Sequence, residues 1–118
     1  MSTDRTLKVF GIKQCDTCRK AMKWLEVEGR RFQWQDIREQ PLSQAELAVW
    51  VKEIGPESLV NRRSTTWRQL GETKRVQAMD PEGAVELLKS HPTLIKRPVF
   101  RAGDHWLVGF NEAVRDSL

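Results

Sequence analysis

The feature that most constrains this chain is a junction between an apolar segment and a helical segment that carries Cys15 and Cys18. Residues 7–12 have the pattern of a short strand, and helical spacing begins at Cys15. The first N–H groups of a helix lack partners and carry partial positive charge, so they stabilise a thiolate. We therefore expect Cys15 to be a nucleophile with a lowered pKa. The nearby cations expected to help are Lys13, Arg19 and Lys20.

Cys18 admits two interpretations. It follows Cys15 within one helical turn, close enough to attack a mixed disulfide formed there. Cysteine is also among the most buried residue types and often packs as a small apolar side chain. Cys18 fits that interpretation too, because Ala21, Met22 and Leu25 share its helical face. A resolving role and a packing role both remain open.

A metal site is the other use of a C-x-x-C pair. Structural zinc takes four ligands, and the remaining candidates, His91 and His105, are far apart in the sequence and unpaired. We therefore expect no metal. A C-x-x-C beside a strand–helix unit instead favours a thioredoxin-like redox protein.

The composition indicates the class of protein. The 118 residues suit a single domain, 1–118, that buries a core without disulfides. No apolar run approaches the ~20 residues of a membrane helix, and the chain enters a strand pattern without a signal peptide. We therefore expect a cytoplasmic protein whose thiols stay reduced unless they perform redox chemistry. The net charge of +4 permits anionic partners, and neither direct nucleic-acid binding nor a membrane is expected.

The order of predicted elements indicates the fold. Strands are expected at residues 7–12, 31–37, 98–101 and 105–108, and a closing helix at 110–118. The expected helix N-caps are Ser43 (in a capping box with Glu46), Asp80 and Asn111. The helix between the first two strands makes them parallel, with a right-handed crossover. The order β-α-β … β-β-α, with a helical insertion at about 43–91, predicts an α/β thioredoxin-like fold with a mixed four-stranded sheet.

Two arginine-bearing segments are candidate anion sites. Arg63 precedes a predicted helix, and Arg97 precedes Pro98, which forces the arginine into an extended backbone conformation. A cis peptide bond there would aim the arginine. A guanidinium suits an oxyanion, a carboxylate or a thiolate. The alternative is a solvated run of charge. Trp67, which lies between basic residues, is interpreted as packing rather than as a base-stacking surface.

Four blocks of sequence resemble one family. They are residues 11–21 (GIKQCDTCRKA), 61–70 (NRRSTTWRQL), 94–98 (LIKRP) and 107–111 (LVGFN). In this order they resemble the ArsC/Spx/YffB family, nearest to the YffB-type branch. The resemblance implies a thioredoxin-like fold with a helical insertion, with Cys15 as nucleophile and with Arg97 and a cis Pro98 binding an anion. It places Arg63 at or near a site arginine, and Lys13 joins the expected anion-binding set.

The resemblance also suggests co-substrates and partners. Arsenate reductases of the family use the cysteine at the Cys15 position with glutathione and glutaredoxin. Here the lead into Cys15 is Gly-Ile-Lys-Gln rather than the His-Asn-Pro type, and Gly109-Phe110 replaces a late arginine that cradles arsenate. These departures favour a glutathione-dependent thiol/disulfide reductase over an arsenate reductase. The other alternative is an Spx-like redox-sensing regulator that binds the RNA polymerase α subunit, because Spx-type members carry C-x-x-C at this place.

Overall fold

The structure, a computed structural model, describes residues 7–118, which form two compact units. Of the described residues, the sheet unit comprises 7–40 together with Arg97–Leu118, and the helical unit comprises Pro41–Lys96. The helical insertion expected at about 43–91 falls within the helical unit. Among the described residues, no helix is long and apolar enough to cross a membrane.

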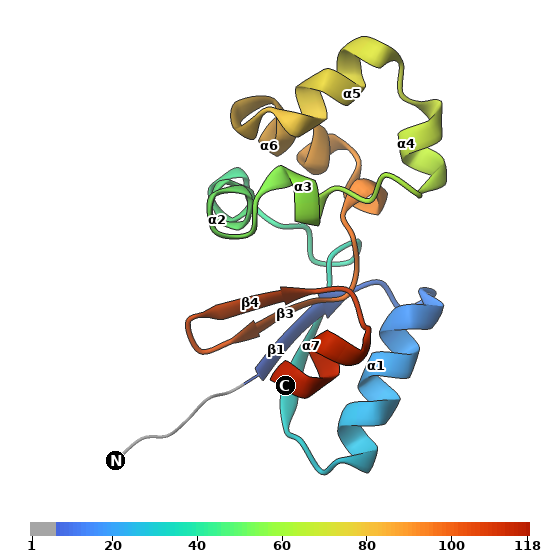
Figure 1. The fold of residues 1–118 in the computed structure, drawn as a ribbon, viewed down its shortest axis with the longest axis vertical. Helices are drawn as coiled ribbons and strands as arrows, with labels where there is room; N and C mark the ends of the chain where they lie inside the picture. Colours follow the sequence, from blue (N-terminus) through green and yellow to red (C-terminus); the bar gives the residue numbers. More distant parts are fainter. Residues whose placement is uncertain (1–6) are drawn as a thin grey trace. The chain divides into compact units, whose positions relative to one another are not determined.

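The sheet unit has the predicted α/β architecture (Figure 1). Its elements are β1 (Leu7–Gly11), α1 (Asp16–Val27), β2 (Phe32–Asp36), β3 (Val99–Ala102), β4 (His105–Val108) and α7 (Glu112–Ser117). The described strands form one sheet of order β2-β1-β3-β4. β1 runs parallel to β2, whereas the β1–β3 and β3–β4 pairs are antiparallel. The prediction of a mixed, four-stranded thioredoxin-like sheet is confirmed.

The core of the sheet unit forms on one face of the central strands. Val9 of β1 pairs with Phe100 of β3, and both side chains are fully buried. Ala21 and Leu25 of α1 and Val114 of α7 pack against the same cluster, so both helices cover this face. At the rim, Trp24 meets Phe110 edge-on with ring centroids 5.8 Å apart. Burial of this apolar surface fixes α1, and with it the residue that begins the helix.

Local signals set the ends of these elements. Gly29, at φ 69°, ends the turn after α1, a backbone conformation that glycine adopts without a Cβ clash. The Asn111 side chain accepts a hydrogen bond of 2.9 Å from the N–H of Val114, which confirms the predicted cap of α7. Gly103, at φ 62°, lies in the turn of the hairpin that joins β3 and β4.

The helical unit contains mainly short helices. They are α2 (Gln44–Ile54), α3 (Pro56–Leu59), α4 (Thr65–Gln69), α5 (Glu72–Met79), α6 (Pro81–Ser90) and the 3₁₀ helix η1 (Pro92–Leu94). The capping box of Ser43 and Glu46 and the Asp80 cap are confirmed. Within the predicted helical insertion, the sequence did not predict α3 as a separate helix, and it did not predict the isolated bridge between Val60 and Ile95. Both are too short to leave a periodic pattern.

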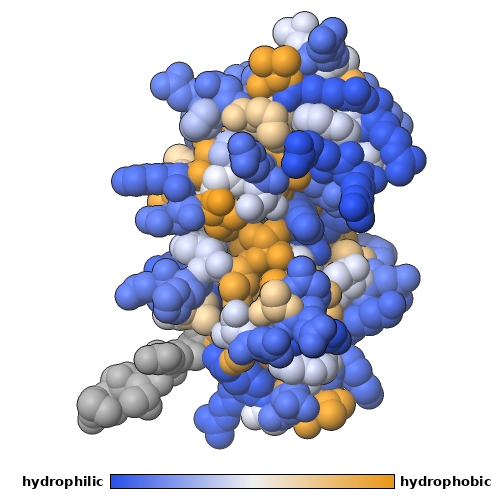
Figure 2. Space-filling model, in the orientation of Figure 1, coloured by the Kyte–Doolittle hydropathy of each residue, from blue (hydrophilic) through white to orange (hydrophobic). Residues whose placement is uncertain are grey.

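The surface is mostly hydrophilic on the face shown in Figure 2. The exposed large apolar residues are Val27, Val49 and Val76, which lie on three different helices. Single exposed apolar residues of this kind are ordinary for a folded protein. They are therefore no basis for assigning a binding surface.

Candidate active site around Cys15

Cys15 lies where the first strand gives way to the first helix, as predicted. It is the N-cap of α1, with an extended backbone (φ −81°, ψ 119°). Its N–H donates to the Ile12 carbonyl at 3.0 Å, which closes the turn, and its own carbonyl accepts the first helical hydrogen bond from Arg19 at 3.0 Å. The side chain is half-buried. The sulfur therefore lies beside the unpaired N–H groups of the first helical turn.

The surroundings of Cys15 favour its thiolate. Burial alone would raise the pKa of the thiol, yet the backbone N–H of Cys18, the Cys18 side chain and the Arg97 guanidinium together hold that pKa below its ordinary value. These contacts favour the charged form of the sulfur, which is the form that a nucleophile requires.

The three cations next to Cys15 in the sequence are placed differently from the expectation. The Lys13 ammonium pairs with the Glu39 carboxylate at 2.8 Å, which raises the Lys13 pKa. Arg19 donates from Nε to the Lys13 carbonyl at 2.9 Å, and Lys20 is exposed. The expectation that these side chains lower the Cys15 pKa is corrected, because Arg97 is the cation that does so. The anion-binding role of Lys13 stays a prediction.

Cys18 is fully buried on the inner side of α1. Burial raises the pKa of its thiol to about 12. A Cβ built on Gly11 would lie 2.4 Å from the Cys18 sulfur and 2.9 Å from Cη2 of Trp34, so the sulfur packs directly on the β1 backbone. The packing interpretation therefore holds for the side chain. The hydrogen bond between the two thiols also places the Cys18 sulfur next to Cys15, as a resolving role requires.

Arg97 and Pro98 lead into β3. Their peptide bond is cis, as predicted. Pro98 is fully buried, and its carbonyl accepts a hydrogen bond of 2.8 Å from the N–H of Gly109, which ties the loop to the end of β4. Arg97 is half-buried and its guanidinium acts on the Cys15 thiol. The loop thus supplies a fixed positive charge to the sulfur.

Arg63 belongs to the helical unit, in the turn before α4. Its N–H donates to the Asn61 side chain at 3.0 Å, and its carbonyl accepts from Arg68 at 3.3 Å. The side chain is exposed. A role for Arg63 beside Cys15 stays a prediction.

Asp36 is a further residue near the site, and its role is not predicted from the sequence. It is the last residue of β2, is 6% exposed, and is the buried charged residue of the described chain. Its carboxylate accepts a hydrogen bond of 2.9 Å from the N–H of Lys13, within the loop that leads to Cys15. The signal in the sequence was an acidic residue at the end of a strand expected to lie beside β1.

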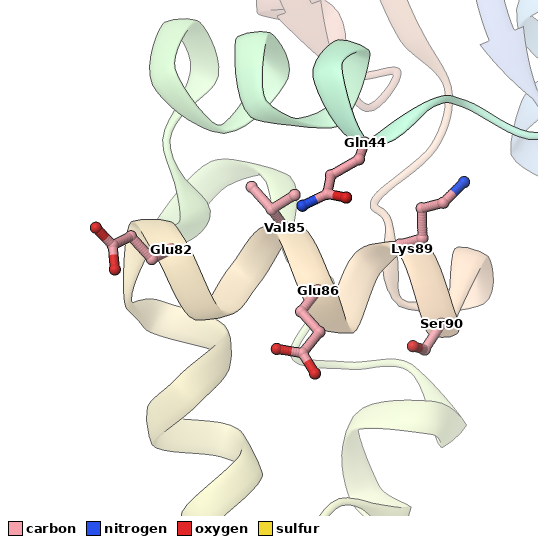
Figure 3. Close-up of a pocket in the computed structure, with 6 residues that line it drawn as sticks. All are labelled: Gln44, Glu82, Val85, Glu86, Lys89 and Ser90. Carbon is pink, nitrogen blue, oxygen red and sulfur yellow. The ribbon is translucent and has the colours of Figure 1, made fainter.

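A surface hollow of about 380 Å³ lies within the helical unit (Figure 3). Its lining residues are Gln44, Glu82, Val85, Glu86, Lys89 and Ser90. Lys89 also donates to the Leu42 carbonyl at 3.0 Å, so its charge helps hold the start of α2. No thiol lines the hollow, and it is not part of the candidate site.

A half-buried cysteine at the N-cap of the first helix, with an arginine acting on its thiol and a buried cis-proline just before the third strand, defines a thioredoxin-like thiol protein. The model of the ArsC family matches residues 10–117, and the chain belongs to that family. It is 41% identical over 106 residues to an uncharacterized protein of Haemophilus influenzae, which covers 90% of this chain and 92% of the relative. It is 32% identical to the global transcriptional regulator Spx of Streptococcus pyogenes, over 88% of this chain and 78% of the regulator.

The fold also resembles a solved structure, the YffB protein. The two chains superpose with a TM-score of 0.86 at 34% identity, over 95% of this chain and 97% of the other. This similarity agrees with the nearest branch expected from the sequence blocks.

Proposed function

We propose that the protein is a thiol/disulfide reductase that uses Cys15 as its nucleophile and glutathione as co-substrate. The observation that carries the proposal is the half-buried Cys15 sulfur, whose thiolate is favoured by the Cys18 amide and by Arg97. A thiolate near neutral pH attacks disulfides, whereas an ordinary thiol is mostly protonated. The proposed place of action is the cytoplasm, where thiols are kept reduced.

The reaction proceeds by successive thiol–disulfide exchanges. The Cys15 thiolate attacks one sulfur of a substrate disulfide, forms a mixed disulfide and releases the other sulfur as a thiolate. A glutathione thiolate then attacks the substrate sulfur of this mixed disulfide, which returns the Cys15 thiolate and leaves a disulfide between glutathione and that half of the substrate. A second glutathione thiolate attacks the glutathione sulfur of that disulfide, which releases the substrate thiolate and forms glutathione disulfide. Arg97, with Arg63 and Lys13, is proposed to bind a carboxylate of the substrate or of glutathione. Glutaredoxin is a candidate partner for recycling.

The buried Cys18 fits one of two roles in this scheme. It either donates a hydrogen bond to the Cys15 thiolate or attacks the mixed disulfide in place of glutathione. The first role needs no movement of the side chain, and the high pKa of Cys18 keeps its thiol protonated. We therefore favour glutathione as the resolving thiol.

The test is turnover of a small disulfide with glutathione as reductant. The variants are Cys15→Ser, Cys18→Ser and Arg97→Gln, with Arg101→Gln as a matched control. Arg101 is a suitable control because its guanidinium stacks on Trp106 at 5.2 Å, on the hairpin rather than on the thiol. We expect Cys15→Ser to abolish turnover and Cys18→Ser to retain most of it. Turnover that survives Cys15→Ser would overturn the mechanism.

A second candidate function is redox-sensing regulation. The C-x-x-C pair and the identity with an Spx regulator support it. Here the Cys15–Cys18 pair would switch binding to the RNA polymerase α subunit. Redox-dependent capture of that subunit, without any reductase turnover, would favour this candidate. Arsenate reduction ranks below both, because Gly109 and Phe110 stand where arsenate reductases of the family carry an arginine.

A further inference from the structure

The loop between Gly11 and Cys15, which leads into α1, is held by the buried carboxylate of Asp36. Asp36 Oδ2 accepts the N–H of Lys13 at 2.9 Å, and Oδ1 accepts the N–H groups of Arg38 at 2.8 Å and of Glu39 at 3.1 Å. Burial would raise the Asp36 pKa, but these N–H groups and the Lys13 charge hold it below its ordinary value. The carboxylate therefore stays charged and joins two loops that leave adjacent strands.

The strand register explains why Asp36 reaches this loop. Asp36 is paired with Gly11, the last residue of β1, in the parallel ladder. The N–H of Ile37 continues the pairing with a 2.9 Å hydrogen bond to the Gly11 carbonyl. The loop from Gly11 to Cys15 therefore starts beside Asp36. Because the loop is short, its residues stay close to the Asp36 carboxylate.

The Lys13 peptide is anchored from both sides. Its N–H donates to the Asp36 carboxylate, and its carbonyl accepts a hydrogen bond of 2.9 Å from Nε of Arg19, the fourth residue of α1. The Lys13 side chain pairs at 2.8 Å with Glu39, whose own N–H is held by Asp36. A closed set of contacts thus fixes the residue two positions before the nucleophile.

We propose, on the basis of the function proposed above, that Asp36 is a positioning residue for the Cys15 nucleophile. The hydrogen bond from the Lys13 N–H to Asp36 fixes the loop, and the fixed loop keeps the Cys15 sulfur near the Cys18 amide and the Arg97 guanidinium. Asp36 touches neither the sulfur nor a substrate in this scheme. Electrostatic stabilisation of a thiolate falls with distance, so a displaced loop weakens it.

The direction in which the Cys15 pKa changes when Asp36 is replaced distinguishes a positioning role from a direct electrostatic effect of the carboxylate. A nearby carboxylate repels a thiolate, so removing the Asp36 charge alone would lower the Cys15 pKa. Loosening the loop would raise that pKa, because the sulfur would move away from its N–H and guanidinium partners. A purely structural role would change the stability of the fold and leave the pKa where it is.

The experiment is the pH dependence of Cys15 alkylation by iodoacetamide, followed by mass spectrometry of the intact chain. The variants are Asp36→Ala and Asp36→Asn, the latter keeping one acceptor oxygen if the alanine variant folds poorly. We expect Asp36→Ala to raise the Cys15 pKa by about one unit, which slows alkylation at neutral pH by up to about tenfold, and Asp36→Asn to raise it less. A lowered or unchanged pKa in Asp36→Asn would overturn the proposal.

The matched control is Asp80→Ala. Asp80 also binds a backbone N–H, that of Gly83 at 3.1 Å, but it caps α6 in the helical unit. We expect this variant to lose stability and to keep the wild-type Cys15 pKa. The readout is alkylation rather than turnover, so the two proposals can fail separately. If the protein shows no reductase turnover but the variants shift the Cys15 pKa as expected, the reductase function is wrong and the positioning role of Asp36 is supported.

Discussion

The Cys18 sulfur occupies space that a side chain at Gly11 would need. A Cβ on Gly11 would lie 2.4 Å from that sulfur, closer than real Cβ contacts allow. Cys18 is fully buried, and the Trp34 ring also lies close to the position of that Cβ. The sulfur therefore cannot easily move away to make space for a side chain at residue 11. The first strand and the first helix therefore approach each other as closely as they do because residue 11 is glycine.

Gly11→Ala is expected to destabilise the fold by about 2 kcal/mol, because overpacking a buried contact of this kind typically costs 1–3 kcal/mol. Urea unfolding measures the loss. Gly71→Ala is the matched control, since nothing lies within 4 Å of a Cβ there and its φ of −74° suits alanine. Equal stability of the two variants would contradict the close packing of β1 on Cys18.

Arg97→Gln is expected to raise the Cys15 pKa by about one unit, because the variant removes the positive charge that stabilises the thiolate. The pH profile of Cys15 alkylation gives the value. Arg101→Gln, which removes a guanidinium stacked on Trp106, should leave the profile unchanged. An identical shift in both variants would point to net charge rather than to a specific contact.

Cys18 gives the fold a pH dependence on the alkaline side. The Cys18 pKa is raised to about 12 by burial, so the folded chain holds this proton where the unfolded chain, at about 8.5, has lost it. The associated stability is complete below about pH 8.5 and is lost as the pH rises toward 12. Cys18→Ala should be less stable than wild type at pH 7, and the gap should narrow above pH 9 in thermal unfolding. A constant gap would mean that Cys18 ionises without a burial penalty.

Asp36 gives a pH dependence of the opposite sense. Its folded pKa lies below the ordinary value of about 3.9, so its contribution is complete above that pH and is lost as the pH falls through the folded pKa. Wild type should therefore be more stable than Asp36→Asn at pH 7, by about 1–3 kcal/mol. The difference should shrink below about pH 4 in urea unfolding. A difference that is independent of pH would show that the carboxylate charge does not contribute.

The part of the fold set by local signals was predictable from the sequence. Caps such as Ser43 and Asn111, and the glycine that ends α1, act within one turn of the chain, so their signals are complete in a short window. The position of Cys15 follows in the same way from a strand that leads into a helix. The parallel pair of β1 and β2 follows from the helix between them.

The electrostatics of the site was less predictable, because it depends on contacts between distant segments. Lys13 is near Cys15 in the sequence, yet its ammonium group forms an ion pair with the Glu39 carboxylate. Arg97, far along the chain, is the cation that acts on the sulfur. An acidic residue at the end of a half-exposed strand does not by itself predict that three N–H groups converge on it, as they do on Asp36.

The pKa of Cys15 in the unmodified protein measures directly whether its surroundings stabilise the thiolate. It is measured from the pH dependence of alkylation, or from thiolate absorbance with Cys15→Ser subtracted. We predict a midpoint below the ordinary thiol value of about 8.5, with Cys18 unreactive over the same range. A Cys15 midpoint at or above about 8.5 would contradict this prediction.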